Sequence, residues 1–186
     1  MFPITGPNAV RPYSTPMASS PSAIVVIGVA GSGKTTVARE LAAHFGFEFL
    51  DADDFHSADA RSGMAAGIPL TDSEREPWVQ TLADELRRHA RSGRSTVLAF
   101  SGLRAAHRQR LRDSGVPLRF VYLQAPPHVI AGRLATRNDH FMPPELLASQ
   151  LDALQVPDHE PDVLALNTDR PLAEVVERAV AALSAS

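Results

Sequence analysis

A glycine-rich run directly follows a short apolar segment near the start of the chain and limits the folds that the chain can adopt. Residues 23–27 are all apolar, which predicts a short buried strand. Residues 28–35 are GVAGSGKT and match the pattern G-x-x-x-x-G-K-[ST] of a phosphate-binding loop. Apolar residues then recur at helical spacing, at Val37, Leu41 and Phe45. Strand, loop and helix occur in the order that a P-loop requires, so we predict an α/β fold built around this loop.

Each part of the loop has a physical role in binding a nucleoside triphosphate. Glycines let successive backbone N–H groups face phosphate oxygens, and the helix N-terminus adds partial positive charge. We expect Lys34 to contact the β- and γ-phosphates of ATP and the Thr35 hydroxyl to bind Mg²⁺. Lys34 is the only lysine in the chain, at the position where a compact, flexible ammonium is needed. The predicted nucleotide-binding residues are Gly28, Val29, Ala30, Gly31, Ser32, Gly33, Lys34, Thr35 and Thr36.

Composition narrows the classes of partner. The chain has 186 residues, a formal net charge of −3 and no cysteine. This length suits one domain, and the lack of cysteine excludes disulfides and zinc–thiolate sites. No basic stripe is visible, so we expect no nucleic-acid partner. No apolar run approaches the roughly 18 residues of a membrane span, so we expect no membrane partner either.

The N-terminal segment differs in composition from the remainder of the chain. Its first 22 residues contain five prolines among serine, threonine and glycine, a composition that does not form a packed core. It lacks a basic region followed by an apolar core, so we do not interpret it as a signal peptide. We expect a disordered tail over residues 1–22 and a single P-loop domain over residues 23–186, with Met17 as a candidate natural start.

Apolar runs alternate with amphipathic stretches along the domain. The predicted strands are 23–27, 47–54, 95–101, 117–123 and 162–167. One predicted helix directly follows the P-loop, and another contains Arg108 and Arg112. The other predicted helices are 73–91, 126–137, 143–155 and 172–183. Residues 57–70 are small and glycine-rich and are given no element. The alternation predicts a three-layer α/β fold with a central five-stranded parallel sheet and a small helical lid.

Two acids end the second predicted strand and are candidates for chemistry. Ligands of open α/β sheets bind at the carboxyl ends of the strands, and Asp51 and Asp53 lie two residues apart on one side of an extended chain. We predict that Asp51 joins Thr35 at Mg²⁺ and that Asp53 accepts a hydrogen bond and a proton from an acceptor hydroxyl. The alternative is that these acids cap the next helix, a role that suits Asp54.

Other motifs fit less well. A Rossmann site would need a third glycine where Thr36 stands, and Asn167-Thr168-Asp169 only loosely resembles the base-reading motif of a GTPase. The histidines show no zinc-ligand spacing, and we expect surface or loop positions for His44, His89, His128 and His159. Two histidines, His56 and His140, are candidates for the lining of an acceptor pocket. Trp78 is predicted to lie in the core.

Taken together, these segments resemble the gluconate kinase family of small P-loop kinases, which is related in fold to shikimate kinase. The resemblance runs from about Ile24 to the last predicted helix. The matching segments are GVAGSGKTT, FLDADDFH, Met64 with GIPLTDSEREPW, AFSGLR with Arg108, RLATRNDHF and LLASQLDALQVP. The chain departs from the family at Ala60 and Gly63, where asparagine and lysine are common, and at His107, where an aromatic is common.

The resemblance implies a kinase that transfers phosphate from ATP to D-gluconate with Mg²⁺, in the cytoplasm and as a homodimer. The carboxylate of a sugar acid suits a bidentate guanidinium, and Arg75, Arg104 and Arg108 are the candidates. Arg133 and Arg137 resemble lid arginines that offset charge during transfer. The predicted catalytic residues are thus Lys34, Asp53, Arg133 and Arg137. A kinase of another small sugar acid or polyol, or a nucleotide-dependent switch without transferase activity, remain alternatives.

Overall fold

The computed structural model describes residues 20–65, 70–136 and 144–185. Its centre is a parallel sheet of five strands in the order β2-β3-β1-β4-β5. The strands are β1 (Ala23–Ile27), β2 (Glu48–Asp51), β3 (Thr96–Ala99), β4 (Leu118–Gln124) and β5 (Val163–Asn167). The predicted central five-stranded parallel sheet is confirmed.

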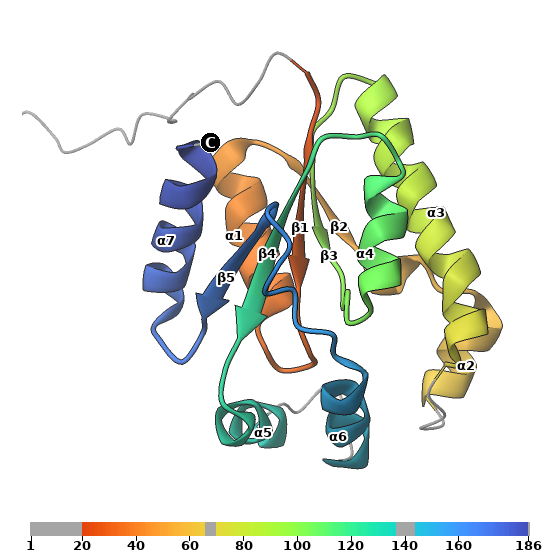
Figure 1. Ribbon diagram of the computed structural model, residues 1–186, viewed down its shortest axis with the longest axis vertical. Coiled ribbons are helices and arrows are strands. Elements are labelled where there is room, and N and C mark those ends of the chain that lie inside the picture. Colours follow the sequence, from red (N-terminus) through yellow and green to blue (C-terminus); the bar gives the residue numbers. More distant parts are fainter. Residues whose placement is uncertain (1–19, 66–69, 137–143, 186) are drawn as a thin grey trace, which may run out of the picture.

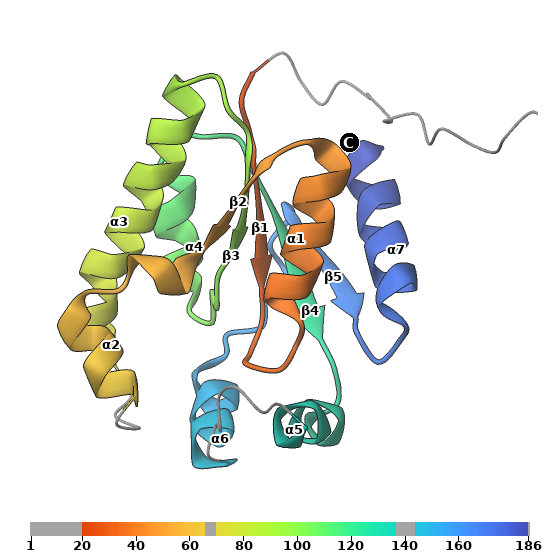
Figure 2. The same cartoon turned by 180° about the vertical axis from the view of Figure 1, so that it is seen from behind.

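Helices cover both faces of this sheet (Figures 1 and 2). On one face lie α1 (Lys34–Phe45) and α7 (Leu172–Ser184), and on the other lie α3 (Asp72–Arg91) and α4 (Ala105–Arg112). Every residue of β1 is buried, since Val25 and Ile27 pack toward α3 and α4 whereas Ile24 and Val26 pack toward α1 and α7. A strand buried on both sides is what a sheet sandwiched between helical layers requires, so the three-layer prediction holds.

The remaining helices lie at the carboxyl end of the sheet. They are α2 (Ala58–Ala65), α5 (Pro127–Ala135) and α6 (Pro144–Ala153). In Figure 1, α5 and α6 sit side by side beyond the strand ends. A small apolar cluster joins them to the P-loop residue Val29 and to Leu103, which follows β3. This cluster is where a helical lid was expected.

Local sequence explains the ends of two of these helices. Thr71 caps α3, because its hydroxyl accepts a hydrogen bond from the Glu74 N–H while the Glu74 carboxylate accepts one from the Thr71 N–H. Gly46 ends α1 in the left-handed conformation and its N–H binds the Ala42 carbonyl. The helix α3 begins at Asp72, one residue before its predicted start.

The structure corrects four expectations. Residues 52–54 do not extend the second strand, because the Asp51 carboxylate accepts a hydrogen bond from the Asp53 N–H and starts a 3₁₀ turn over Ala52–Phe55. The capping acid is therefore Asp51 rather than Asp54. The segment after this turn, to which the sequence analysis gives no element, contains α2. His89 is 1 % exposed, so its predicted surface position is wrong, whereas His44, His128 and His159 are exposed as predicted.

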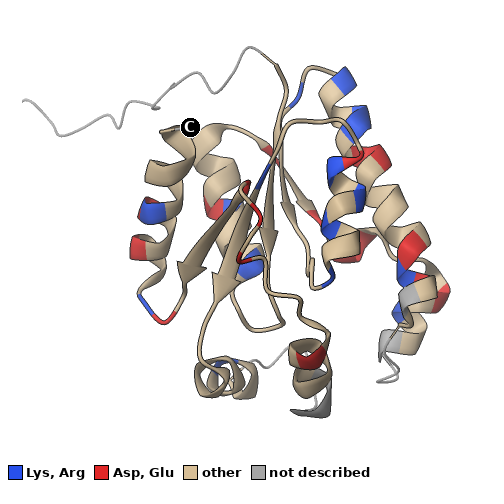
Figure 3. Cartoon of the chain, in the orientation of Figure 1, with Lys and Arg blue, Asp and Glu red and all other residues tan. Residues whose placement is uncertain are grey.

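Some expectations concern parts of the chain outside the described residues. The predicted tail, including Met17, lies there apart from its last few residues, as do Arg137, His140 and Pro143. None of the helices among the described residues has both the length and the apolar character needed to cross a membrane. Figure 3 shows positive and negative residues interspersed along α3, whereas the Lys, Arg, Asp and Glu positions of α4 are all arginines.

Candidate active site

The P-loop connects β1 to α1 at the carboxyl edge of the sheet (Figure 1). Its first glycine is needed because a Cβ at Gly28 would lie 2.7 Å from the backbone oxygen of Leu123, at a φ of +149°. Gly33 is the N-cap of α1, so the helix begins at Lys34 with its first N–H groups at the loop. A curled loop that leads into a helix N-terminus is suited to binding phosphate.

Lys34 and Thr35 lie next to the second strand. The Thr35 hydroxyl donates a hydrogen bond to Asp51 Oδ2 at 3.2 Å, although the two residues are 16 positions apart in the chain. The Lys34 ammonium donates to the Val29 carbonyl at 3.0 Å, which holds the side chain along its own loop. The structure thus brings together the hydroxyl and the carboxylate that the sequence assigns to a common metal ion.

Asp53 and His56 occupy the adjoining turn. The Asp53 side chain is 86 % exposed, whereas the His56 side chain is only 3 % exposed, and the two groups are 3.7 Å apart at Asp53 Oδ1 and His56 Nε2. His56 stacks on Trp78 with ring centroids 4.0 Å apart. Trp78 is 9 % exposed and donates its indole N–H to the Ala52 carbonyl at 2.8 Å, so its predicted core position is confirmed.

Electrostatics differ between these two neighbours. Desolvation by the surrounding protein, followed by the charge of Asp51, raises the pKa of Asp53 above its ordinary value. Burial lowers the pKa of His56, and the Asp53 carboxylate opposes that shift only in part. Because the Asp53 side chain is open to solvent, the charge of Asp51 rather than desolvation is the cause that the geometry supports. A raised pKa makes this carboxylate a better proton acceptor than an ordinary aspartate.

The three candidate carboxylate-binding arginines lie in different surroundings. Arg75 is half-buried in the first turns of α3, and Arg104 is half-buried at the N-cap of α4. Arg108 is 1 % exposed, and its guanidinium pairs with Glu160 inside the protein. The structure therefore directs Arg108 toward other parts of the chain, in contrast to the contact expected for it with an acceptor.

Arg133 is the described member of the expected lid pair. It lies near the end of α5, and its two terminal nitrogens donate to the hydroxyl and the carbonyl of Thr168. Thr168 directly follows β5 and is 4 % exposed. This contact joins α5 to the loop after the last strand at the carboxyl edge of the sheet.

Sequence reasoning missed Gln150 on α6 as an individual site residue. Its Oε1 accepts a hydrogen bond from the Ala30 N–H at 2.7 Å, across 120 positions of the chain. The only signal available was its place in the segment that resembles the family. Through this contact α6 is fastened directly to the backbone of the P-loop.

The amino-acid sequence is similar to a known family and to proteins of known name. A family model described as an AAA domain matches residues 24–157. A gluconokinase from Gluconobacter oxydans (strain 621H) is 37% identical over 168 residues, which cover 90% of this chain and 94% of that protein.

Solved structures give the same picture. The crystal structure of a gluconokinase from Sinorhizobium meliloti 1021 is similar with a TM-score of 0.81 and 38% identity, covering 89% of this chain and 93% of that one. Shikimate kinase from Acinetobacter baumannii is similar with a TM-score of 0.55 and 22% identity, covering 89% of this chain and 94% of that one. The second likeness concerns the fold alone.

Proposed function

Because the chain belongs to the gluconokinase family of P-loop proteins, we propose that it transfers the γ-phosphoryl group of ATP to the terminal hydroxyl of D-gluconate. The product is 6-phospho-D-gluconate. The observation that carries the proposal is the contact between Thr35 on the P-loop and Asp51 on β2, with Asp53 two residues further on. This arrangement supports a phosphate site and an acceptor site side by side.

The residues present fit a magnesium ion. Thr35 Oγ1 and Asp51 Oδ2 lie 3.2 Å apart, and both are oxygen atoms that can ligate a metal ion. Mg²⁺ binds oxygen ligands, and only a few of them usually come from the protein. Among the described residues no three acidic, histidine or cysteine side chains gather into a metal site, which suits an ion held mainly by nucleotide and water. We assign Thr35 and Asp51 to the ion, which when bound neutralises charge on the β- and γ-phosphates.

The remaining groups align and stabilise the transferred phosphoryl. The P-loop N–H groups and Lys34 hold the triphosphate, since phosphoryl transfer depends mainly on positioning and on charge. Asp53 is the base: its carboxylate accepts the proton of the terminal hydroxyl as that oxygen attacks phosphorus. His56, buried beside it, lines the acceptor side. Exposure of the Asp53 side chain supports this role because the acceptor must reach it from solvent.

We assign arginines to the two negatively charged groups of the substrates, the carboxylate of gluconate and the phosphoryl group that is transferred. Arg104 and Arg75 are proposed to bind the carboxylate of gluconate, and we withdraw Arg108 from that role because it pairs internally with Glu160. Arg133 is proposed to stabilise the transferring phosphoryl. An arginine has five N–H donors, so its bonds to Thr168 leave others for a nucleotide. Arg137 and His140 keep the phosphate and acceptor roles expected for them from the sequence.

The experiment is coupled ADP release by the purified chain with D-gluconate, other aldonates, shikimate and AMP as acceptors. We expect D-gluconate to be the best substrate and shikimate and AMP to be inert. Ala60 and Gly63 are smaller than the residues common in the family, so lower activity on other aldonates is expected as well. ATP turnover that does not respond to any acceptor would favour a nucleotide switch, and activity confined to AMP or shikimate would refute the assignment.

Assembly and location follow from the family in the same way. We propose a homodimer in the cytoplasm, with a sugar acid as the only substrate besides ATP. Light scattering on the eluting protein during size-exclusion chromatography tests the dimer directly. A mass equal to one chain of 20.0 kDa across a wide concentration range would contradict it.

A further inference from the structure

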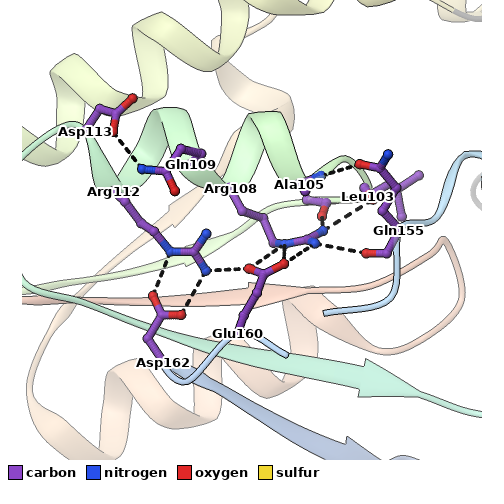
Figure 4. Close-up of polar contacts among 10 residues, drawn as sticks. Leu103, Ala105, Arg108, Gln109, Arg112, Asp113, Gln155, Glu160 and Asp162 are labelled. Carbon is purple, nitrogen blue, oxygen red and sulfur yellow. Dashed lines mark hydrogen bonds and ion pairs between the residues drawn. The ribbon is translucent and has the colours of Figure 1, made fainter. Parts of the chain in front are cut away.

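Arg108 is the largest of the fully buried side chains among the described residues. Its guanidinium lies between α4 and the segment that connects α6 to β5, where Glu160 and Asp162 also lie (Figure 4). Nε donates to both carboxylate oxygens of Glu160 at 3.0 Å each. Nη2 donates to the same carboxylate and, at 2.9 Å, to the carbonyl of Gln155.

The third nitrogen of Arg108 binds the loop that follows β3. Nη1 donates to the carbonyl of Gly102 at 2.6 Å and to that of Leu103 at 3.3 Å. All five N–H donors of the guanidinium therefore have acceptors within the protein. Two of these acceptors are the peptide carbonyls immediately before Arg104, the residue proposed to bind the acceptor carboxylate.

The loop is also fixed from its own backbone. Gly102 has a φ of +58°, and a Cβ at this position would lie 2.6 Å from Cγ2 of Ile27 on the central strand. The left-handed conformation is readily adopted only by glycine when space is this small. The carbonyl of Gly102 is thus turned toward Arg108 by a backbone that has little freedom to adopt another shape.

Gln155 holds the other side of Arg104. Its Oε1 accepts a hydrogen bond from the Ala105 N–H at 2.7 Å, and its own N–H donates to the Leu103 carbonyl at 2.8 Å. Arg104 is therefore enclosed by hydrogen bonds on its preceding and following peptide groups. These bonds come from residues about 50 positions away and from the next turn of α4.

We propose that Arg108, with Gln155, is a positioning residue that sets the orientation of Arg104 toward the acceptor carboxylate. The proposal rests on the proposed function, since it concerns the acceptor of that reaction. Arg108 touches neither substrate. Its planar guanidinium holds the carbonyls of Gly102 and Leu103 and so fixes the backbone that leads into Arg104. A group that is preorganised in this way loses less freedom when it binds its ligand. Lysine cannot replace it, because an ammonium has three donors and no planar fork.

The principal variant is Arg108→Lys, which keeps the charge beside Glu160 and loses the simultaneous contacts to Gly102, Leu103 and Gln155. We expect the KM for gluconate to rise by about 10-fold or more, because small displacements of a positioning group have large kinetic effects. The KM for ATP should stay unchanged. The matched control is Arg112→Lys, one turn further along α4, where the arginine pairs with Glu160 and Asp162 and makes no hydrogen bond to the loop.

A double-mutant cycle separates positioning from general structural damage. In an Arg104→Ala background, Arg108→Lys should cause no further rise in the gluconate KM, because the residue through which it acts is gone. The ratio of kcat/KM for gluconate over D-glucitol, which has no carboxylate, should also fall in Arg108→Lys and remain near the wild-type ratio in Arg112→Lys.

A second variant guards against misfolding of Arg108→Lys. Gln155→Ala removes the contact to the Ala105 N–H from an exposed side chain, so the buried ion pair is left intact. It should raise the gluconate KM in the same direction by several-fold. The positioning role would be overturned by a folded Arg108→Lys protein with a wild-type gluconate KM and a wild-type ratio of gluconate to D-glucitol activity. It would also be overturned if Arg108→Lys raised the gluconate KM equally in the Arg104→Ala background, or if Gln155→Ala kept a wild-type KM. A wild-type enzyme inactive on gluconate would instead refute the proposed function.

Discussion

Replacing Trp78 with phenylalanine tests how the core holds the proposed base in place. The indole N–H of Trp78 donates to the carbonyl of Ala52, the residue directly before Asp53, and the ring stacks on His56. Phenylalanine keeps an aromatic ring but has neither the N–H donor nor the second ring. The substitution therefore removes an anchor of the turn over Ala52–Phe55 and leaves Asp53 itself unchanged.

The expected magnitude has two parts. A hydrogen bond of this kind contributes about 1 kcal/mol net, and more where the acceptor is left without a partner. Loss of part of a buried ring costs less than the roughly 3–5 kcal/mol of truncation to alanine. We expect the free energy of unfolding to fall by about 2–3 kcal/mol. The kcat for gluconate should fall by about 10-fold, since displacement of a reacting group by about 1 Å can cost ~10²-fold.

The measurements are urea unfolding followed by circular dichroism, because the variant has lost the only tryptophan, and steady-state kinetics. Phe120→Leu is the control: Phe120 is fully buried in the same core cluster but lies on β4, which β3 and β1 separate from β2. This control should lose stability and keep its kcat. A Trp78→Phe protein within about 0.5 kcal/mol of wild type, with an unchanged kcat, would refute the anchoring role.

Four further outcomes are expected. Lys34→Ala should lower kcat by ~10²–10³ with the fold retained by circular dichroism, since one preorganised charge is lost; a near-normal kcat would contradict the P-loop assignment. Asp53→Asn should lower kcat and leave the KM for ATP intact, because an amide cannot take the proton; a rise confined to the ATP KM would argue against the base. Arg133→Ala should lower kcat more than ATP affinity, and a loss of melting temperature alone would assign Arg133 a structural role through Thr168. Hydrogen bonds from Arg108, then Arg112, lower the pKa of Glu160, so its stabilising contribution is present above the ordinary carboxylate pKa and is lost as pH falls through the lowered value. The free energy of unfolding, measured as the pH is lowered into the acid range, should therefore fall less in Glu160→Gln than in wild type.

Features that depend on local sequence could be predicted. The P-loop, the apolar β1 strand and the amphipathic α7 each follow from residues that are neighbours in the chain, so pattern alone located them. The site elements at strand ends could be predicted for a different reason, because parallel strands bring their carboxyl ends to one edge of the sheet. Asp51 and Thr35 illustrate this, since the sequence assigns both to one Mg²⁺ ion and their side-chain oxygens lie 3.2 Å apart.

Features that depend on a distant partner could not be predicted. Arg104 and Arg108 are equally basic and lie one helical turn apart, and it is Glu160 together with three backbone carbonyls that makes Arg108 an internal residue. His89 is buried beside Glu48, whose Oε2 lies 2.9 Å from Nδ1, a pairing between residues 41 positions apart. Helical spacing gives the face on which a residue lies but not which side chain it will meet. The helix α2 was missed for another reason, because its glycine and small residues give weak periodicity.

The solitary lysine gives this protein an unusual chemical selectivity. Amine-directed reagents ordinarily react at many surface lysines, but here the α-amino group and Lys34 are the only primary amines in the chain. Lys34 is half-buried with its ammonium on the Val29 carbonyl, inside the loop where the triphosphate is proposed to bind. An acylating or reductively alkylating reagent can therefore form stable adducts with amines at only two places in the chain, and one of them lies in the proposed nucleotide site. The rate of modification at Lys34, distinguished from the α-amino group by mass spectrometry of the peptides as ATP is titrated, measures nucleotide occupancy without any engineered probe.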